Sequence, residues 1–261
     1  MSERVRFTSE LLERRPCADE AGQERRVKSR YSGAWICALE ALTPVCIQSA
    51  FAKLTDKDKA FLPGSSLRGM VRNVAEVLGA GCAEFHEGRP EPPEILATPC
   101  TEEAACLVCR VFGFVHGDYS WAGEVRFHDT LSAAVPWVKF GLSRAGFGGG
   151  GDGEEGWRVF PHRLPKLPEG RIRCAATGSK FQFRVDYLNL DAEEYGLVKF
   201  ALTLQHGEID LCHKLGYQKA QGLGSVLIRT PNDKSAPIGP DIERYLATRS
   251  FAEFQGYRRY R

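Results

Sequence analysis

A long alternating segment that runs directly into a capped helix constrains the fold of this chain more than any other stretch. In SKFQFRVDYLNL, apolar side chains stand at every second position: Phe181, Phe183, Val185 and Tyr187. This spacing predicts a strand with one buried face. Asp191 then caps a helix over AEEYGLVKFALTLQ, whose first turn carries glutamates near the positive end of the helix dipole. A strand of this kind needs a sheet around it.

Other segments supply that sheet. AWICALEALTPVCIQSA alternates from Trp35 to Ala41 before the break at Thr43-Pro44, and further strands are predicted over 123–132 (GEVRFHDTLS) and near GSVLIRT. Strands and helices are interleaved along the chain, so we expect an α+β fold. Its helices should cover one face of an antiparallel sheet, as in ferredoxin-like domains.

A second helix is predicted after the compact turn in FLPGSSLRGMVRNVAEVL. Pro63 and Gly64 interrupt the chain, Ser65 and Ser66 are good N-cap residues, and apolar residues follow with helical spacing. A serine-capped helix start offers backbone N–H groups to an anion such as phosphate, with the side chains of Arg68 and Arg72 beside it. The alternative is an ordinary amphipathic helix with solvated arginines.

Composition limits the classes of function. The net charge is only +2, from 35 basic and 33 acidic residues, which excludes a uniformly basic nucleic-acid binder but permits local basic patches. No segment has the order of a signal peptide or the length of a membrane span, so we expect a cytoplasmic protein without a membrane partner. In that reducing compartment, the nine cysteines indicate metal binding or burial rather than disulfides.

A cysteine cluster in CTEEAACLVCRVFG is a candidate zinc site. Cys106 and Cys109 form a C-x2-C pair, and Cys100 lies just before them. Three thiolates and one further ligand can hold a tetrahedral zinc ion in a closed, structural site. The candidates for the fourth ligand are His86, which we prefer, then Cys82, and last His116. An iron–sulfur cluster or simple packing of the thiols are the alternatives.

The glycine-rich segment HKLGYQKAQGLGSV (213–226) is a second candidate for anion binding. It lacks both the phosphate-loop motif and the context of a dinucleotide-binding motif, which argues against a nucleotide-dependent enzyme. Gly222 and Gly224 nevertheless permit close approach of a phosphate chain, and Lys214 and Lys219 supply positive charge. The alternative is a glycine-rich turn before the last strand.

Taken together, these motifs resemble the RAMP superfamily of CRISPR-associated proteins, in particular the backbone subunits of type III RNA-guided effector complexes. The resemblance rests on PGSSLRG (63–69), CLVCRVFG (106–113), GEVRFHD, GSKFQFRVDYLNL and the 213–226 segment, in the expected order from about Trp35 to Ile228. It implies an RRM-like domain over 31–230 with a zinc-binding insertion at about 80–116 and a glycine-rich loop at 146–156. Residues 1–30 are expected to be an N-terminal arm outside the core, and residues 231–261 a C-terminal extension.

The resemblance also implies function. Such a subunit holds guide RNA along its backbone, contributes to recognition of target RNA, and stacks with other RAMP-type subunits in a ribonucleoprotein of antiviral defence. The residues expected to bind RNA are those of the two anion-binding segments: Ser65, Ser66, Arg68, Arg72, Lys214, Lys219, Gly222 and Gly224.

In slicing members of the family, an acidic residue before the PGSSLRG helix promotes cleavage of target RNA with Mg²⁺ or Mn²⁺. Asp56 and Asp58 are the acids of this loop, and a solvated turn is the alternative. His128 and Asp129 form a further acid–base candidate. Two rival functions remain open: a free-standing endoribonuclease that processes guide precursors with His128 or His213 as general base, and a zinc-bearing adaptor that binds only protein.

Overall fold

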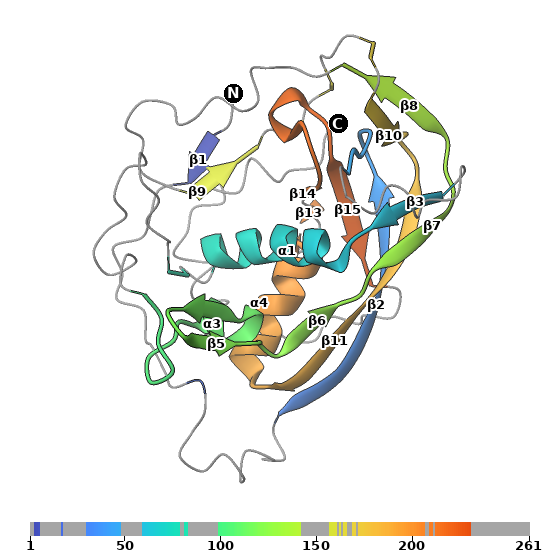
Figure 1. Cartoon of the computed structure of the whole chain (residues 1–261). Helices are drawn as coiled ribbons and strands as arrows, with labels where there is room; N and C mark the ends of the chain where they lie inside the picture. The colour runs from blue at the N-terminus through green and yellow to red at the C-terminus, as the bar shows by residue number, and fades with distance from the viewer. Residues whose placement is uncertain are drawn as a thin grey trace.

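The computed structural model describes residues 3–5, 17, 30–47, 59–78, 81–82, 99–141, 157–160, 162, 164–165, 169–170, 172–206, 209–210 and 212–230. Its centre is a five-stranded antiparallel sheet with the order β14-β15-β2-β11-β6 (Figure 1). The strands of this sheet are β2 (Tyr31–Ala41), β6 (Val125–Phe127), β11 (Lys180–Leu190), β14 (His213–Lys214) and β15 (Ser225–Arg229).

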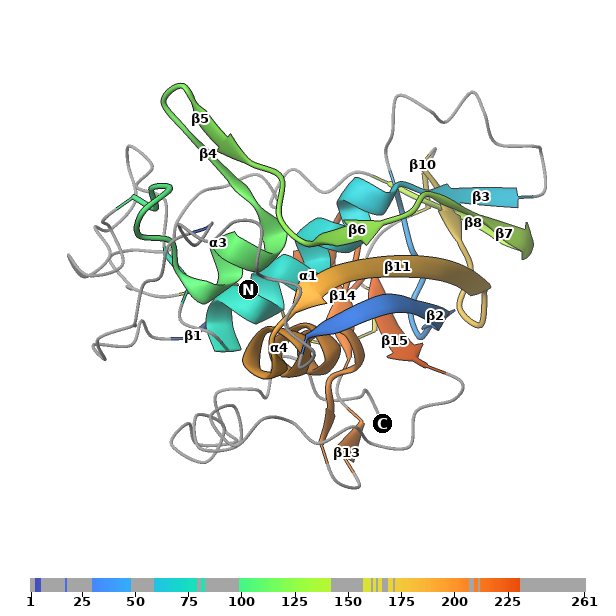
Figure 2. The ribbon, with the colours of Figure 1, turned by 90° about the horizontal axis from the view of Figure 1, so that it is seen from below.

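The helices lie on one face of this sheet (Figure 2). They are α1 (Gly64–Leu78), α3 (Leu107–Phe112) and α4 (Ala192–Thr203). Along the chain, the core elements follow the order β2, α1, β6, β11, α4, β15, which is the β-α-β-β-α-β arrangement of ferredoxin-like folds. The predicted α+β class, with helices on one face of an antiparallel sheet, is therefore confirmed.

Short two-stranded ladders surround the core. The pairs are β1 (Glu3–Val5) with β9 (Trp157–Val159), β3 (Lys59–Leu62) with β7 (Thr130–Ala134), β4 (Phe114–His116) with β5 (Tyr119–Trp121), β8 (Trp137–Phe140) with β10 (Ile172–Ala175), and β12 (Gln205–His206) with β13 (Ile209–Asp210). A 3-10 turn, η3 (Lys219–Gln221), lies between β14 and β15.

The pairing of β2 with β11 forms the centre of the main sheet. Phe181, Phe183 and Val185 of β11 lie opposite Leu39, Cys37 and Trp35 of β2, and all six side chains are buried. The residues between them on each strand point to the other face, as the alternation predicts. Asp191 forms a full capping box with Glu194 at the start of α4, so the predicted helix cap is confirmed as well.

Two predictions need correction. The strand predicted over 123–132 is broken, because His128 and Asp129 separate β6 from β7. The described parts of the predicted N-terminal arm are attached to the domain: Glu3–Val5 pairs with β9, and Cys17 is buried and donates its backbone N–H to the carbonyl of Glu102 at 2.7 Å. Backbone hydrogen bonds and the burial of Cys17 therefore hold segments that were expected to lie outside the core.

Other predicted segments fall outside the described residues: the glycine-rich loop 146–156, the extension 231–261 and most of the first 30 residues. Within the described part of the chain, no helix combines the length and apolar character needed to span a membrane.

Candidate nucleic-acid interface and metal cluster

The start of α1 is held by the β6–β7 junction. Gly64 packs so closely on this junction that an added Cβ would lie 2.2 Å from the carbonyl oxygen of Phe127. Its N–H donates to the Asp129 carboxylate at 2.6 Å, and the N–H groups of Ser66 and Leu67 donate to the Pro63 carbonyl. Asp129 is thus a helix cap that sequence spacing alone had missed.

This geometry corrects the predicted anion site. Ser65 and Ser66 lie inside the first turn of α1 rather than at its N-cap. Three of the first four N–H groups already have acceptors, one of them a carboxylate, so bare helix amides cannot form the main anion site. What the first turn presents instead is its side chains: Ser65 is exposed and Ser66 is half-buried.

The glycine-rich segment folds around its own lysine. The buried ammonium of Lys214 donates to the carbonyls of Gly222 and Leu223, at 3.3 and 3.1 Å. Gly222 and Gly224 both have positive φ, at 97° and 77°, and are buried. These three predicted RNA ligands therefore shape the loop from within.

Lys219 is placed differently. Its Nζ lies 5.3 Å from the ring centroid of Phe160, and burial lowers its pKa from the ordinary lysine value. An anion bound beside this ammonium would stabilise its charged form, because the anion replaces the solvation that water no longer supplies.

One cavity joins the two predicted anion-binding segments, which are far apart in the sequence. Its volume is about 610 Å³, and its lining contains two lysines and no carboxylate among the described residues. From α1 it takes the face formed by Ser65, Ser66, Gly69, Met70 and Asn73, and from the rest of the chain Ile47, Phe160, Lys214, Leu215, Gly216, Tyr217 and Lys219. This shared cavity, which we call the α1–loop cavity, has polar side chains on its α1 wall, and its other wall combines two lysines with apolar side chains.

The two arginines of α1 lie outside the lining of this cavity. Arg72 donates to Glu76 at 2.7 Å, to the Gly113 carbonyl at 2.8 Å and to the Cys109 sulfur at 3.7 Å, so it braces α1 against α3. Arg68 is half-buried, and burial, followed by the nearby charge of Arg72, lowers its pKa. RNA contact by either arginine stays a prediction, and Arg72 has an evident structural role.

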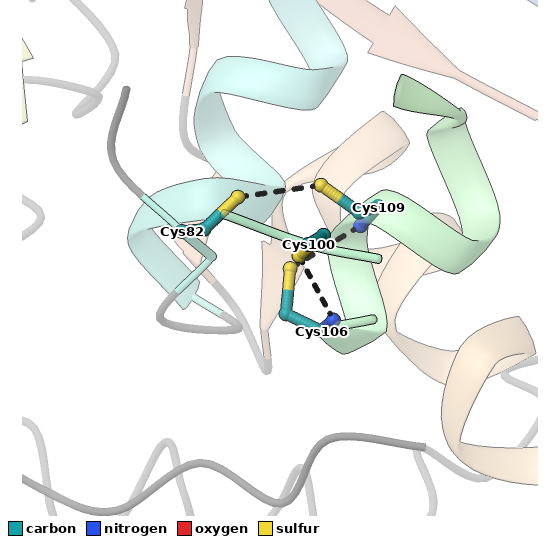
Figure 3. A group of neighbouring side chains, drawn as sticks. All are labelled: Cys82, Cys100, Cys106 and Cys109. Atoms are coloured by element: carbon teal, nitrogen blue, oxygen red, sulfur yellow. Dashed lines mark hydrogen bonds between the residues drawn. The ribbon is translucent and has the colours of Figure 1, made fainter. Parts of the chain in front are cut away.

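Four cysteines meet beside Arg72 (Figure 3). The sulfurs of Cys82, Cys100, Cys106 and Cys109 all lie within 4.8 Å of one another, and the Cys82 and Cys109 sulfurs are 3.4 Å apart. A zinc ion at about 2.3 Å from each sulfur would place the sulfurs about 3.8 Å apart, so this set can hold such a metal. Cys82 supplies the fourth thiol, while His86 lies outside the described residues.

Hydrogen-bond donors surround the cluster. The Cys106 sulfur accepts the N–H of Cys109 at 3.4 Å and caps α3, and the Cys100 sulfur accepts the N–H of Cys106 at 3.3 Å. Hydrogen bonds among the four thiols hold the pKa of Cys106 well below the usual value for a thiol and raise those of Cys82 and Cys109, so the Cys106 sulfur is the thiolate of the metal-free cluster. Donors and one cation therefore point at sulfur, which is the outer arrangement that stabilises a tetrathiolate metal site.

The predicted zinc segment is part of the main core. Val108, Val111 and Phe112 of α3 are fully buried, and the Arg110 guanidinium pairs with Glu194 of α4 at 3.3 Å. Burial raises the pKa of Glu194, and Arg110 acts in the opposite direction. The four-cysteine cluster thus lies where α1, α3 and α4 meet.

The acid–base candidates that the structure describes do not converge. Asp56 and Asp58 lie outside the described residues, and Asp129 is occupied at the cap of α1. His128 instead contacts Asp186 at 2.7 Å, and Arg184 holds the pKa of that carboxylate low, with a smaller effect from His128. His213 is completely buried, bonds to the Leu202 carbonyl, and has its pKa lowered to about 4 by desolvation, so it cannot reach an RNA phosphate.

The structure is a ferredoxin-like domain with a cationic cavity beside the glycine-rich segment 213–226. Comparison with known proteins gives its family. Residues 38–226 match the RAMP superfamily. The chain therefore belongs to the RAMP superfamily, as predicted. A search of curated proteins gives no match.

Two solved structures are similar to this chain at a low level. One is titled "Type IV-B CRISPR Complex", with 18% identity, a TM-score of 0.46, and coverage of 80% of this chain and 94% of the other. The second is titled "Crystal structure of Thermofilum pendens Csc2", with 10% identity, a TM-score of 0.44, and coverage of 90% and 80% respectively.

Proposed function

We propose that this chain is an RNA-binding subunit of a CRISPR ribonucleoprotein, of the backbone kind found in type III effector complexes. The observation that carries the proposal is the α1–loop cavity, where two RAMP-type motifs from distant parts of the chain line a single cationic surface. The motif resemblance and membership of the RAMP superfamily support the same assignment.

In this function, RNA lies against the cavity through its sugar–phosphate backbone. The hydroxyls of Ser65 and Ser66, the Asn73 amide and Lys219 offer donors to phosphate and ribose oxygens, while Tyr217 and Phe160 add apolar surface. Backbone contacts of this kind position RNA without reading its sequence, which suits a protein that must accept any guide. Base pairing between guide and target then supplies specificity.

RNA binding is tested by replacing cavity side chains. We expect Ser65→Ala/Ser66→Ala and Lys219→Ala each to weaken binding of unrelated single-stranded RNAs to the same degree. Lys219→Ala should also reduce the slope of log K against log salt by about 0.7, the value for one lost phosphate contact on a single strand. Fluorescence anisotropy at several salt concentrations measures both quantities.

The matched control is Lys139→Ala, since Lys139 is an exposed lysine of β8 outside the cavity lining. It removes the same charge and should leave affinity and salt slope nearly unchanged. Equal effects of Lys139→Ala and Lys219→Ala would show that only net charge matters and that the cavity is not the RNA site.

We further propose that a structural zinc ion is held by Cys82, Cys100, Cys106 and Cys109. With four protein ligands, such a site leaves no open position for catalysis, so the metal supplies stability to the RNA-binding domain. The four ligands are soft thiol sulfurs, which supports zinc over a harder metal that prefers oxygen ligands. The Arg72 guanidinium beside the Cys109 sulfur also offsets negative charge on the cluster.

Target cleavage, where this chain contributes to it, is proposed to occur only in the assembled complex. A carboxylate near the scissile phosphate can hold a divalent ion that stabilises the attacking and leaving oxygens, and Asp56 and Asp58 are the candidates. We expect cutting of paired target RNA to require Mg²⁺ or Mn²⁺, and Asp56→Ala or Asp58→Ala to abolish it while RNA binding persists. Cutting that survives in the double variant would assign the activity to another subunit.

A further inference from the structure

Two cysteines outside the metal cluster face each other across a short antiparallel bridge. Val45 and Ala175 exchange both backbone hydrogen bonds, each at 2.9 Å, and so form a hydrogen-bonded pair. The next position on each side, Cys46 and Cys174, is then a directly opposed pair without backbone hydrogen bonds. In a regular antiparallel ladder such a pair has its Cα atoms about 4.5 Å apart, which lies within the range that a disulfide can span.

The two side chains belong to the same small cluster of buried residues. The interaction of the two thiols lowers the pKa of Cys46 and raises that of Cys174, which makes Cys46 the better nucleophile. Both are buried, at 1% and 0% exposure, in a small apolar cluster with Leu223 that is separate from the main core. The Cys46 sulfur also lies 3.6 Å from the Arg173 carbonyl, close beside its partner strand.

From this juxtaposition we propose that Cys46 and Cys174 are a redox-sensitive dithiol that closes to a disulfide when the protein meets a peroxide. The Cys46 thiolate attacks one oxygen of hydrogen peroxide, forming a sulfenic acid and releasing the other oxygen as water after protonation. The Cys174 sulfur then attacks the Cys46 sulfur, the S–O bond breaks, and a second water leaves. In total, two thiols and one peroxide give one disulfide and two waters.

Access to the buried pair fits a small oxidant. The bridge between Val45 and Ala175 is isolated and consists of two backbone hydrogen bonds, so parting these two segments locally breaks few hydrogen bonds between them. A water-sized peroxide needs only such an opening, whereas glutathione disulfide would need much more. Oxidation is therefore expected to be selective for the smaller reagent.

The bond would fix one wall of the α1–loop cavity. The Cys46 carbonyl accepts the N–H of Tyr217 at 2.7 Å, and an added Cβ at Gly216 would lie 2.4 Å from the same oxygen. Ile47, Gly216 and Tyr217 all line the cavity. A disulfide at Cys46 would thus tie this wall to β10, whatever the cavity binds.

The test uses the full-length, zinc-loaded protein treated with a small excess of hydrogen peroxide and then digested without reduction. Mass spectrometry should find one cross-linked species joining the Cys46 and Cys174 peptides, reversed by dithiothreitol. The oxidised protein should unfold at a temperature several degrees higher than the reduced one, because the bond closes a very long loop. Glutathione disulfide under the same conditions should give much less cross-link.

Cys46→Ala removes the bond and the stabilisation on oxidation, and Cys37→Ala is the matched control because Cys37 is equally buried but lies in β2. Cys37→Ala should still form the cross-link. The proposal is overturned if peroxide leaves both thiols unmodified, or if it yields sulfinic or sulfonic acid at Cys46 without the cross-link. Both outcomes are read on the wild-type protein, so they do not depend on how well a variant folds.

Discussion

Removing zinc from the four-cysteine cluster is expected to lower the midpoint of thermal unfolding by roughly 10 °C or more, because the ligand set ties together the core of the domain. Cys100, Cys106 and Cys109 are at most 3% exposed and belong to the main hydrophobic core. Without the metal, their thiolates must take up protons or repel one another in a site that excludes water. The free energy of metal binding is then lost from folding.

The damage should extend from the cluster to the RNA-binding surface. Arg72 connects Cys109 and Gly113 to α1, and α1 carries Ser65, Ser66 and Asn73 into the cavity. A cluster that loses its metal would loosen this brace, so RNA affinity should fall together with stability. Because α3 is buried in the main core, the effect is expected in the domain itself.

Elemental analysis, calorimetry and chelation measure these effects together. Protein purified without chelator should contain one zinc per chain, and Cys106→Ala should lose it and unfold at a much lower temperature. Cys37→Ala deletes the same atom from an equally buried site in β2 and should keep the metal. Less than about half an equivalent of zinc in the wild-type protein, or equal destabilisation by the two variants, would contradict the assignment.

Local chemistry explains which parts of the fold were predictable from sequence. The alternation of Phe181, Phe183 and Val185 requires a half-buried strand, and Asp191 with Glu194 needs only neighbouring backbone to form its capping box. The C-x2-C spacing of Cys106 and Cys109 likewise fits one turn of α3. Each of these features depends on residues a few positions apart.

Contacts between distant segments were harder to anticipate. Nothing near Gly64 in sequence indicates that Asp129 will cap α1, and this contact occupies one of the N–H groups on which the anion-site prediction had relied. Cys82 and His86 could not be distinguished as metal ligands by spacing alone. Lys214 was predicted to bind RNA because lysines usually reach solvent. Its ammonium instead donates hydrogen bonds to carbonyls within the glycine-rich segment 213–226.

The substitution Gly224→Ala, in the glycine-rich segment 213–226, is expected to have a second large effect on stability and RNA binding. Gly224 has a φ of 77°, and an added Cβ would lie 1.9 Å from the Leu215 carbonyl oxygen, which is backbone and cannot swing aside. The same oxygen belongs to the turn that forms the cavity wall at Leu215, and Leu215 in turn donates its N–H to Gly224 at 2.7 Å. The substitution therefore has to separate β14 from β15.

We expect Gly224→Ala to lower the free energy of unfolding by about 3–5 kcal/mol and to abolish measurable RNA binding. Gly178→Ala is the matched control, because Gly178 has a similar φ of 83° but nothing lies within 4 Å of its added Cβ. It should cost only about 1–2 kcal/mol, the strain of a left-handed alanine, and should leave RNA binding intact. Urea unfolding and anisotropy titrations compare the two variants directly. If both lose the same stability, the clash with Leu215 is relieved by a small shift of the loop, and the close packing of β14 on β15 is not what shapes the cavity.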